Sequence, residues 1–162
     1  MNVFWLDEDP RKAARYHCDQ HVNKMLLEAA QILSTTLRAH GHDEAFLYQP
    51  THTGHPTVKW ASHSRENWLR LYEFAGALNE EFMERFGHDE AHASWRMLQL
   101  IDRDSIAIPA REPTEPPQCM PEEYCREDLV DAYRAYYAND KEWAEWKYTA
   151  EPDWLLEYRL NA

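Results

Sequence analysis

Paired cysteines, long apolar runs and glycine are largely missing from this chain of 162 residues. Its three cysteines are an odd number and form no Cys-x-x-Cys pair, which favours reduced thiols in a reducing compartment over a disulfide framework. No apolar run approaches the roughly 20 residues of a membrane span, and the N-terminus lacks the basic and apolar regions of a signal peptide. We therefore expect a cytoplasmic protein without a membrane partner.

Helix-forming residues dominate the composition, and only four glycines occur. Hydrophobic residues make up 44% and aromatic residues 13% of the chain, which argues against disorder. The length fits one domain that buries a proper core. The composition therefore predicts a single compact all-α domain over residues 1–162, with four to five helices and a long N-terminal helix.

Negative charge is the second feature of the composition, with a formal net charge of -12 at pH 7. Nucleic-acid binders are usually basic, because the neutralisation of phosphates drives their affinity. The charge therefore argues against tight, non-specific binding to DNA. It leaves room for a local positive groove, since the field depends on where the charges lie.

Capping residues and helical spacing divide the chain into segments. Asp9 and Pro10 are typical of a helix start, and Gly41 is typical of a stop. The pattern predicts a helix from about residue 10 to 39 and a short helix that carries Val58, Trp60 and Ala61. A long helix then begins at Ser64 and is ended by Gly87, and a further helix, capped by Asp89, runs from residue 90 to about 102. A proline-rich connection over residues 104–120 follows, and Pro121 begins the last helix, which Asn139 and Asp140 interrupt or end.

The expected first helix carries one line of polar residues more than an amphipathic helix needs. At about 100° per residue, Val22, Leu26, Ala29 and Leu33 form an apolar stripe, and Cys18 lies near it as a small core residue. A separate line, spaced by four, three, four, three and four residues, holds His17, His21, Lys24, Glu28, Gln31 and Thr35.

Three interpretations of this polar line remain open. It is a partly exposed helix edge with a weak Lys24–Glu28 pair, or a catalytic cluster, because grouped titratable residues are typical of active sites. As a third interpretation, His17 and His21 are spaced to bind zinc from one helix face, completed by Glu28 or by a loop histidine. We favour a catalytic site of Glu28, His21, Lys24 and His17 that has no metal cofactor.

The loop before the second helix adds possible substrate contacts. Loops on helical scaffolds often carry binding residues, and His52, His55, Lys59 and Arg65 would form a local positive edge for a phosphate. Gln31 extends the polar line toward them. Aromatic and basic residues also alternate near the C-terminus, a pattern found in proteins that stack bases but equally in a helical core.

The run Asp19-Gln20-His21-Val22, followed by Glu28, resembles a motif of the phage endonuclease V family of pyrimidine-dimer DNA glycosylases with AP-lyase activity. That family has an Asp-Gln-His-Leu run and, at the same spacing, its catalytic glutamate near the start of a long first helix. The order of later features is also similar: Arg85-Phe86-Gly87 at a helix end, Met120-Pro-Glu-Glu-Tyr124 before the last helix, and a C-terminus rich in Trp and Tyr.

The resemblance implies a compact all-α enzyme whose N-terminal amine attacks the sugar C1′ of a damaged or modified nucleotide and forms a Schiff base. Glu28 would then be the carboxylate that steers protons, with His21 beside it. The amine would belong to Met1, or to Asn2 if the initiator were removed. The substrate base must leave the DNA stack to be reached.

The chain departs from this family at several positions. Asn2 is larger than the family's small second residue, Leu27 and Gln31 stand where the family has arginines, and the chain is acidic where the family is basic. Lys24 is therefore an alternative nucleophile, since desolvation lowers the pKa of a lysine.

Two other functions remain as alternatives to a DNA glycosylase or lyase. The first is an enzyme that acts on a free nucleotide or another small anion, assisted by a divalent metal. The second is a non-enzymatic protein whose acidic surface contacts a basic partner.

Overall fold

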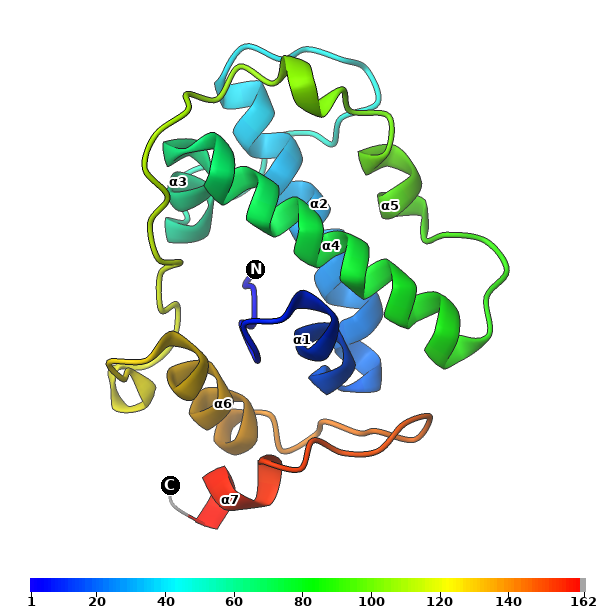
Figure 1. Ribbon diagram of the computed structural model, residues 1–162, viewed down its shortest axis with the longest axis vertical. Coiled ribbons are helices and arrows are strands. Elements are labelled where there is room, and N and C mark those ends of the chain that lie inside the picture. Colours follow the sequence, from blue (N-terminus) through cyan, green and yellow to red (C-terminus); the bar gives the residue numbers. More distant parts are fainter. Residues whose placement is uncertain (161–162) are drawn as a thin grey trace.

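The computed structural model describes residues 1–160, and every regular element in that range is a helix (Figure 1). The expected all-α class is confirmed, but the expected four to five helices are too few. The described part has seven α-helices: α1 (Pro10–Tyr16), α2 (Asp19–Ala39), α3 (Pro56–His63), α4 (Arg65–Phe86), α5 (Ala93–Leu98), α6 (Leu129–Asp140) and α7 (Leu155–Leu160). Two short 3-10 helices, η1 (Arg103–Ser105) and η2 (Glu122–Tyr124), lie between α5 and α6.

Several helix ends follow directly from the local sequence. The Asp9 side chain accepts hydrogen bonds from the first-turn amides of α1, and Pro10 occupies the first helical position. Ser64 caps α4 in the same way. Gly87 ends α4 at φ 67°, a left-handed conformation that glycine adopts without a steric penalty.

The expected single helix over residues 10–39 is wrong, because the chain is extended at His17 and Cys18 between α1 and α2. The Cys18 amide donates to the Tyr137 hydroxyl at 2.9 Å. The buried Arg85 guanidinium donates to the carbonyls of Arg15 and His17 at 2.9 and 2.7 Å. Polar groups released at the break thus find partners far along the chain.

The expected helix over residues 90–102 and the last expected helix also differ from the structure. α5 begins at Ala93 with His92 as its cap, not Asp89, and it ends at Leu98. Pro121 precedes only the short η2, whereas α6 begins at Leu129 after the cap Asp128. The sequence pattern does not predict the C-terminal α7, because this helix has only six residues.

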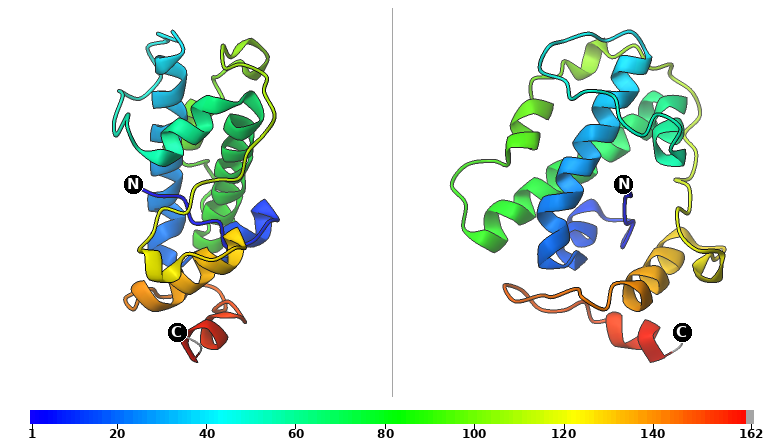
Figure 2. Two further views of the ribbon diagram at one scale, coloured as in Figure 1. Left: turned by 90° about the vertical axis from the view of Figure 1, so that its left-hand side faces the viewer. Right: turned by 180° about the vertical axis from the view of Figure 1, so that it is seen from behind.

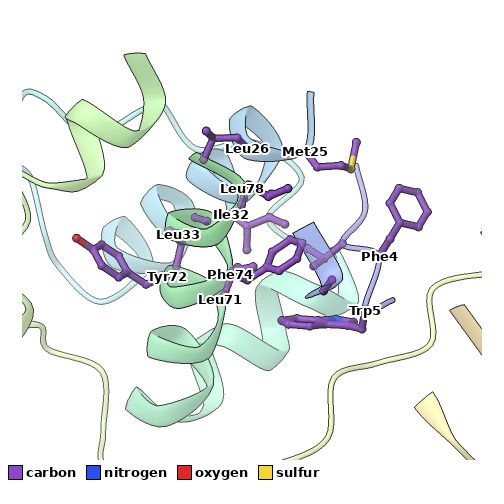
Figure 3. Packing of buried hydrophobic residues seen from close by; sticks show 14 of the residues in the cluster. Phe4, Trp5, Met25, Leu26, Ile32, Leu33, Leu71, Tyr72, Phe74 and Leu78 are labelled. Carbon is purple, nitrogen blue, oxygen red and sulfur yellow. The ribbon is translucent and has the colours of Figure 1, made fainter. Parts of the chain in front are cut away.

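The core forms where α2 packs against α4, and the N-terminal segment inserts beside them (Figure 3). Four consecutive apolar residues, Val3 to Leu6, are buried there. In the described residues, no helix is long and apolar enough to cross a membrane. α2 and α4 form two layers, and the N-terminus lies on the α2 side together with the loop before α3 (Figure 2).

Candidate functional site

Glu28 on α2 meets the beginning of the chain. Its Oε2 accepts a hydrogen bond from the Asn2 amide at 2.8 Å and lies 3.9 Å from the Met1 amine. The Glu28 side chain is 12% exposed, so the carboxylate is reachable yet largely shielded from water. One carboxylate therefore holds the first two main-chain nitrogens.

The main chain of Met1 is more exposed than its side chain. The Met1 side chain is only 2% exposed, whereas the residue as a whole is half-buried. The remaining accessible surface of Met1 therefore lies on its main chain. A buried apolar side chain thus anchors the residue that carries the terminal amine.

Asn2 fixes this terminus from the other side. Its Nδ2 donates to the Cys119 carbonyl at 2.8 Å, and its Oδ1 accepts from the Val3 amide at 2.8 Å. The Cys119 amide in turn donates to the Tyr133 hydroxyl at 3.1 Å. The N-terminus is therefore held between α2 and the connection that leads to α6.

Thr35 brings the histidine loop to the same face. Its Oγ1 accepts from the Thr51 amide at 3.1 Å and donates to the Thr51 carbonyl at 3.4 Å, which pins the loop to α2. His52 follows in an exposed turn with φ 48°. This conformation is uncommon for a residue other than glycine, and it holds the imidazole away from the core.

His55 caps α3 and lies near the chain terminus. Its Nδ1 accepts from the Thr57 amide at 3.1 Å. Partial burial lowers the pKa of His55, and the positive N-terminus and His52 lower it further. The Met1 carbonyl and Glu28 oppose this shift. His55 is therefore a largely neutral imidazole beside the Met1 amine and Glu28 at pH 7.

His17 and His21, by contrast, are buried under the N-terminal segment. The His21 ring stacks on Phe4 with centroids 4.9 Å apart. The Tyr137 hydroxyl accepts from the Cys18 amide and forms a hydrogen bond with His21 Nδ1 at 2.9 Å. His17 Nδ1 donates to the Ala13 carbonyl at 2.6 Å, while its Nε2 has no partner.

Burial keeps both of these imidazoles neutral. It lowers the pKa of His17 to about 4, and the nearby Arg85 adds to this shift. Burial lowers the pKa of His21 to about 3, assisted by the charges of His17, Lys141 and Lys24. The two histidines are therefore neutral, buried residues beneath the N-terminal segment. Cys18 is a buried core residue, as expected.

The other candidates lie around or away from the terminus. Lys24 is exposed on α2 and Lys59 on α3, and neither joins an ion pair within residues 1–160. Gln31 is half-buried. Arg65 donates to the Arg103 carbonyl at 2.7 Å, in a part of the fold that this site does not use.

Asn2 and Cys119 are the site residues that the sequence pattern does not reveal as neighbours. Asn2 is a polar residue at the head of an apolar segment, which is a weak signal for a role at the terminus. Cys119 lies in the irregular connection before α6, where no periodicity fixes its position. Their contact joins residues 117 positions apart, which local spacing does not encode.

The site thus joins an amine, a carboxylate and two loop histidines, and it leaves His17 and His21 beneath it. The rings of His17 and His21 have centroids 6.4 Å apart. In the part of the chain that the structure describes, no group of three His, Cys, Asp or Glu side chains is arranged to hold a metal ion. Comparison of the chain with protein-family models, curated proteins and solved structures finds no match.

Proposed function

We propose that this protein is a DNA glycosylase and lyase that acts through the N-terminal amine, with Glu28 as the carboxylate that handles protons. The observation that carries the proposal is the contact of Glu28 with the first two main-chain nitrogens, at 3.9 Å from the Met1 amine and 2.8 Å from the Asn2 amide. The sequence motif Asp19-Gln20-His21-Val22, followed by Glu28, points to the same carboxylate independently.

The proposed first step is attack of the neutral amine on C1′ of the target nucleotide. Glu28 takes the proton of the ammonium, so that the nitrogen lone pair forms the N–C1′ bond. The C1′–base bond breaks, and the base leaves with the electron pair and takes the proton held by Glu28. A second proton passes from the nitrogen to O4′ as the C1′–O4′ bond breaks, which opens the sugar ring and gives a protonated imine between C1′ and the nitrogen.

In the second step Glu28 directs the elimination. A C2′ proton is removed, its electron pair forms a C2′–C3′ double bond, and the 3′ phosphate leaves with the C3′–O bond electrons. Water then hydrolyses the imine and restores the amine. A carboxylate held this close to the nitrogen needs little rearrangement between the two proton transfers.

In this proposal the substrate contacts come from residues around the N-terminus. His52, Lys24 and Lys59 are exposed on the elements that surround the N-terminus and would hold the phosphates that flank the target. His55 would donate a hydrogen bond from Nε2 at the sugar, since its Nδ1 accepts from the Thr57 amide. The amine must reach C1′ of the target nucleotide, so the target base must leave the helix stack.

Borohydride trapping on an abasic duplex tests the proposal. Reduction of the imine links the protein to the DNA, and mass spectrometry of the linked peptide identifies the nitrogen. We expect the link on the N-terminal peptide. Glu28→Gln should lower the trapping rate at least a hundredfold, a loss typical of a removed acid–base group. Its circular dichroism spectrum should be unchanged.

Matched variants separate the two candidate nitrogens. Acetylation of the terminus should abolish the link. Lys24→Ala should still give the link, but more slowly. Lys12→Ala, at an exposed position of α1, should not change the rate of linking. A link that survives acetylation and disappears in Lys24→Ala would make Lys24 the nucleophile. No link on any abasic DNA would contradict the lyase proposal.

A second candidate function, action on a free nucleotide or sugar phosphate, is favoured by the net charge of -12. A small anion needs only the local cations, whereas a duplex must approach an acidic protein. The same trapping experiment decides between them. Linking to deoxyribose 5-phosphate at a rate equal to or above that for the abasic duplex would favour the small substrate.

A further inference from the structure

Residues 114–119, in the connection between η1 and η2, lie beside the N-terminus and belong to no helix. Figure 1 shows this connection passing α3 on its way to α6. Irregular segments ordinarily lie on the surface with few contacts and move more than helices do. This segment is instead hydrogen-bonded to α4, to α6 and to the N-terminus.

Side chains of α4 and α6 fix both ends of the segment. The Asn67 side chain accepts from the Thr114 amide at 3.0 Å and donates to Thr114 Oγ1 at 2.9 Å. At the other end, the buried Tyr133 hydroxyl donates to the Pro117 carbonyl at 2.8 Å and accepts from the Cys119 amide at 3.1 Å. The segment therefore has a defined position relative to the helices.

Asn2 connects this segment to the Met1 amine and Glu28. Its Nδ2 donates to the Cys119 carbonyl at 2.8 Å, and its main-chain amide donates to Glu28 Oε2 at 2.8 Å. Its Oδ1 accepts from the Val3 amide at 2.8 Å, which fixes the orientation of the side-chain amide. The Asn2 side chain is thus bound at both its donor and its acceptor end.

These contacts leave the Met1 amine little freedom. A chain terminus is poorly ordered unless it is tied down. Here the Met1 side chain is only 2% exposed, and the next peptide amide is bound to Glu28. The amine, 3.9 Å from Glu28 Oε2, lies between these two anchored groups. A displacement of about 1 Å costs on the order of a hundredfold in the rate of a reaction between positioned groups.

We propose that Asn2 and Tyr133 are positioning residues of the lyase reaction. Tyr133 fixes the Cys119 main chain, which in turn fixes the Asn2 side chain. Asn2 then holds the terminal amine next to Glu28. The inference rests on the proposed function, because the amine is the nucleophile in both. Asn2 and Tyr133 act on the position of this nitrogen and not on the substrate.

Borohydride trapping at saturating abasic duplex, with the dissociation constant of the DNA measured in parallel, tests the role of Asn2. Asn2→Asp keeps the acceptor for the Val3 amide but loses the donor to Cys119, and Asn2→Leu has a similar size and loses both. Each variant should lower the rate of linking about ten- to hundredfold and change the dissociation constant less than about twofold. Intact-mass spectrometry checks that each variant keeps Met1.

A double variant tests whether Tyr133 acts through Asn2. Tyr133→Phe removes the hydroxyl that holds Cys119 and should lower the rate of linking about three- to tenfold. In the Asn2→Asp background the same change should lower it less than about twofold, because the connection is already lost. Tyr72→Phe removes another buried hydroxyl, which donates to the Leu98 carbonyl at 3.5 Å, and should not change the rate in either background.

The failures of the two proposals are distinct. Wild-type protein that forms no link would contradict the proposed function and the inference with it. Linking by the wild type at a rate that both Asn2 variants retain would overturn the inference alone. A dissociation constant that rises as much as the rate falls would make Asn2 a substrate contact instead. Full additivity of Asn2→Asp and Tyr133→Phe would mean that Tyr133 does not act through Asn2.

Discussion

At the residue scale, the helix line that stood out in the sequence separates into groups with different surroundings. Glu28 joins the N-terminus, Lys24 faces solvent, and His17 and His21 are buried. Helical spacing places residues on a line but does not say what covers each of them. Here Phe4 covers His21, and that contact comes from a segment outside the helix.

The two buried histidines predict a loss of stability in mild acid. Their folded pKa values, about 4 and about 3, lie below the ordinary value of 6.5. The unfolded chain therefore binds more protons between these values, and stability falls as the pH drops below about 6.5. From about pH 6.5 to about pH 5, each histidine should lower the free energy of unfolding by about 2 kcal/mol.

Urea unfolding across that pH range measures this effect. His21→Gln and His17→Gln should each flatten the pH dependence by about half, even if they lower stability at neutral pH. His63→Gln, which removes an exposed histidine, should leave the slope unchanged. A wild-type stability that stays constant down to about pH 5 would contradict the neutral buried state of both rings.

At the element scale, the sequence predicts most of the helices but misses the break between α1 and α2. Asp9, Ser64 and Gly87 mark helix ends through local chemistry, and all three are confirmed. The break at Cys18 has no such marker, since Cys18 makes no side-chain cap. Partners for the freed groups come from Tyr137 and Arg85, which only the fold brings near.

We therefore expect Arg85 to stabilise the extended segment between α1 and α2. Its side chain is 0% exposed and contacts Glu81 and Asp19 at 3.1 and 3.3 Å, besides the two carbonyls. Arg85→Gln removes the guanidinium that donates to the Arg15 and His17 carbonyls and to one oxygen of the buried Glu81 carboxylate, so it should lower the free energy of unfolding by about 3–5 kcal/mol.

An exposed ion pair provides the control for Arg85. Arg96 and Glu90 lie 3.3 Å apart with side chains 55% and 85% exposed, and Arg96→Gln should change stability by less than about 1 kcal/mol. Chemical denaturation of both variants gives the comparison. If Arg85→Gln lowered the free energy of unfolding no more than Arg96→Gln, local helix signals rather than Arg85 would stabilise the extended segment between α1 and α2.

At the scale of the whole molecule, the candidate site is assembled from segments that local patterns treat separately. The sequence identifies Glu28 and the histidine loop, because a motif and a composition point to them. Only the resemblance, and no local pattern, brings the amine and Glu28 together, since their contact depends on burial of residues 3–6 against α2 and α4.

The charge of the whole molecule predicts an unusual salt dependence for the proposed DNA substrate. A net charge of -12 repels the duplex at long range, and added salt screens that repulsion. Only a few local cations, Lys24 and Lys59 among them, would release counterions from the phosphates. The slope of log binding constant against log salt should therefore lie between 0 and about -3, against about -10 for a strongly basic binder.

Fluorescence anisotropy with a labelled abasic duplex measures this slope. Lys24→Ala with Lys59→Ala should bring it to about zero or make it positive, because repulsion would then dominate. Lys12→Ala with Lys147→Ala changes the net charge equally at exposed positions and should leave the slope unchanged. A wild-type slope steeper than about -5 would require many phosphate contacts. The few cations around the N-terminus do not provide that number, and DNA would then bind another face of the molecule.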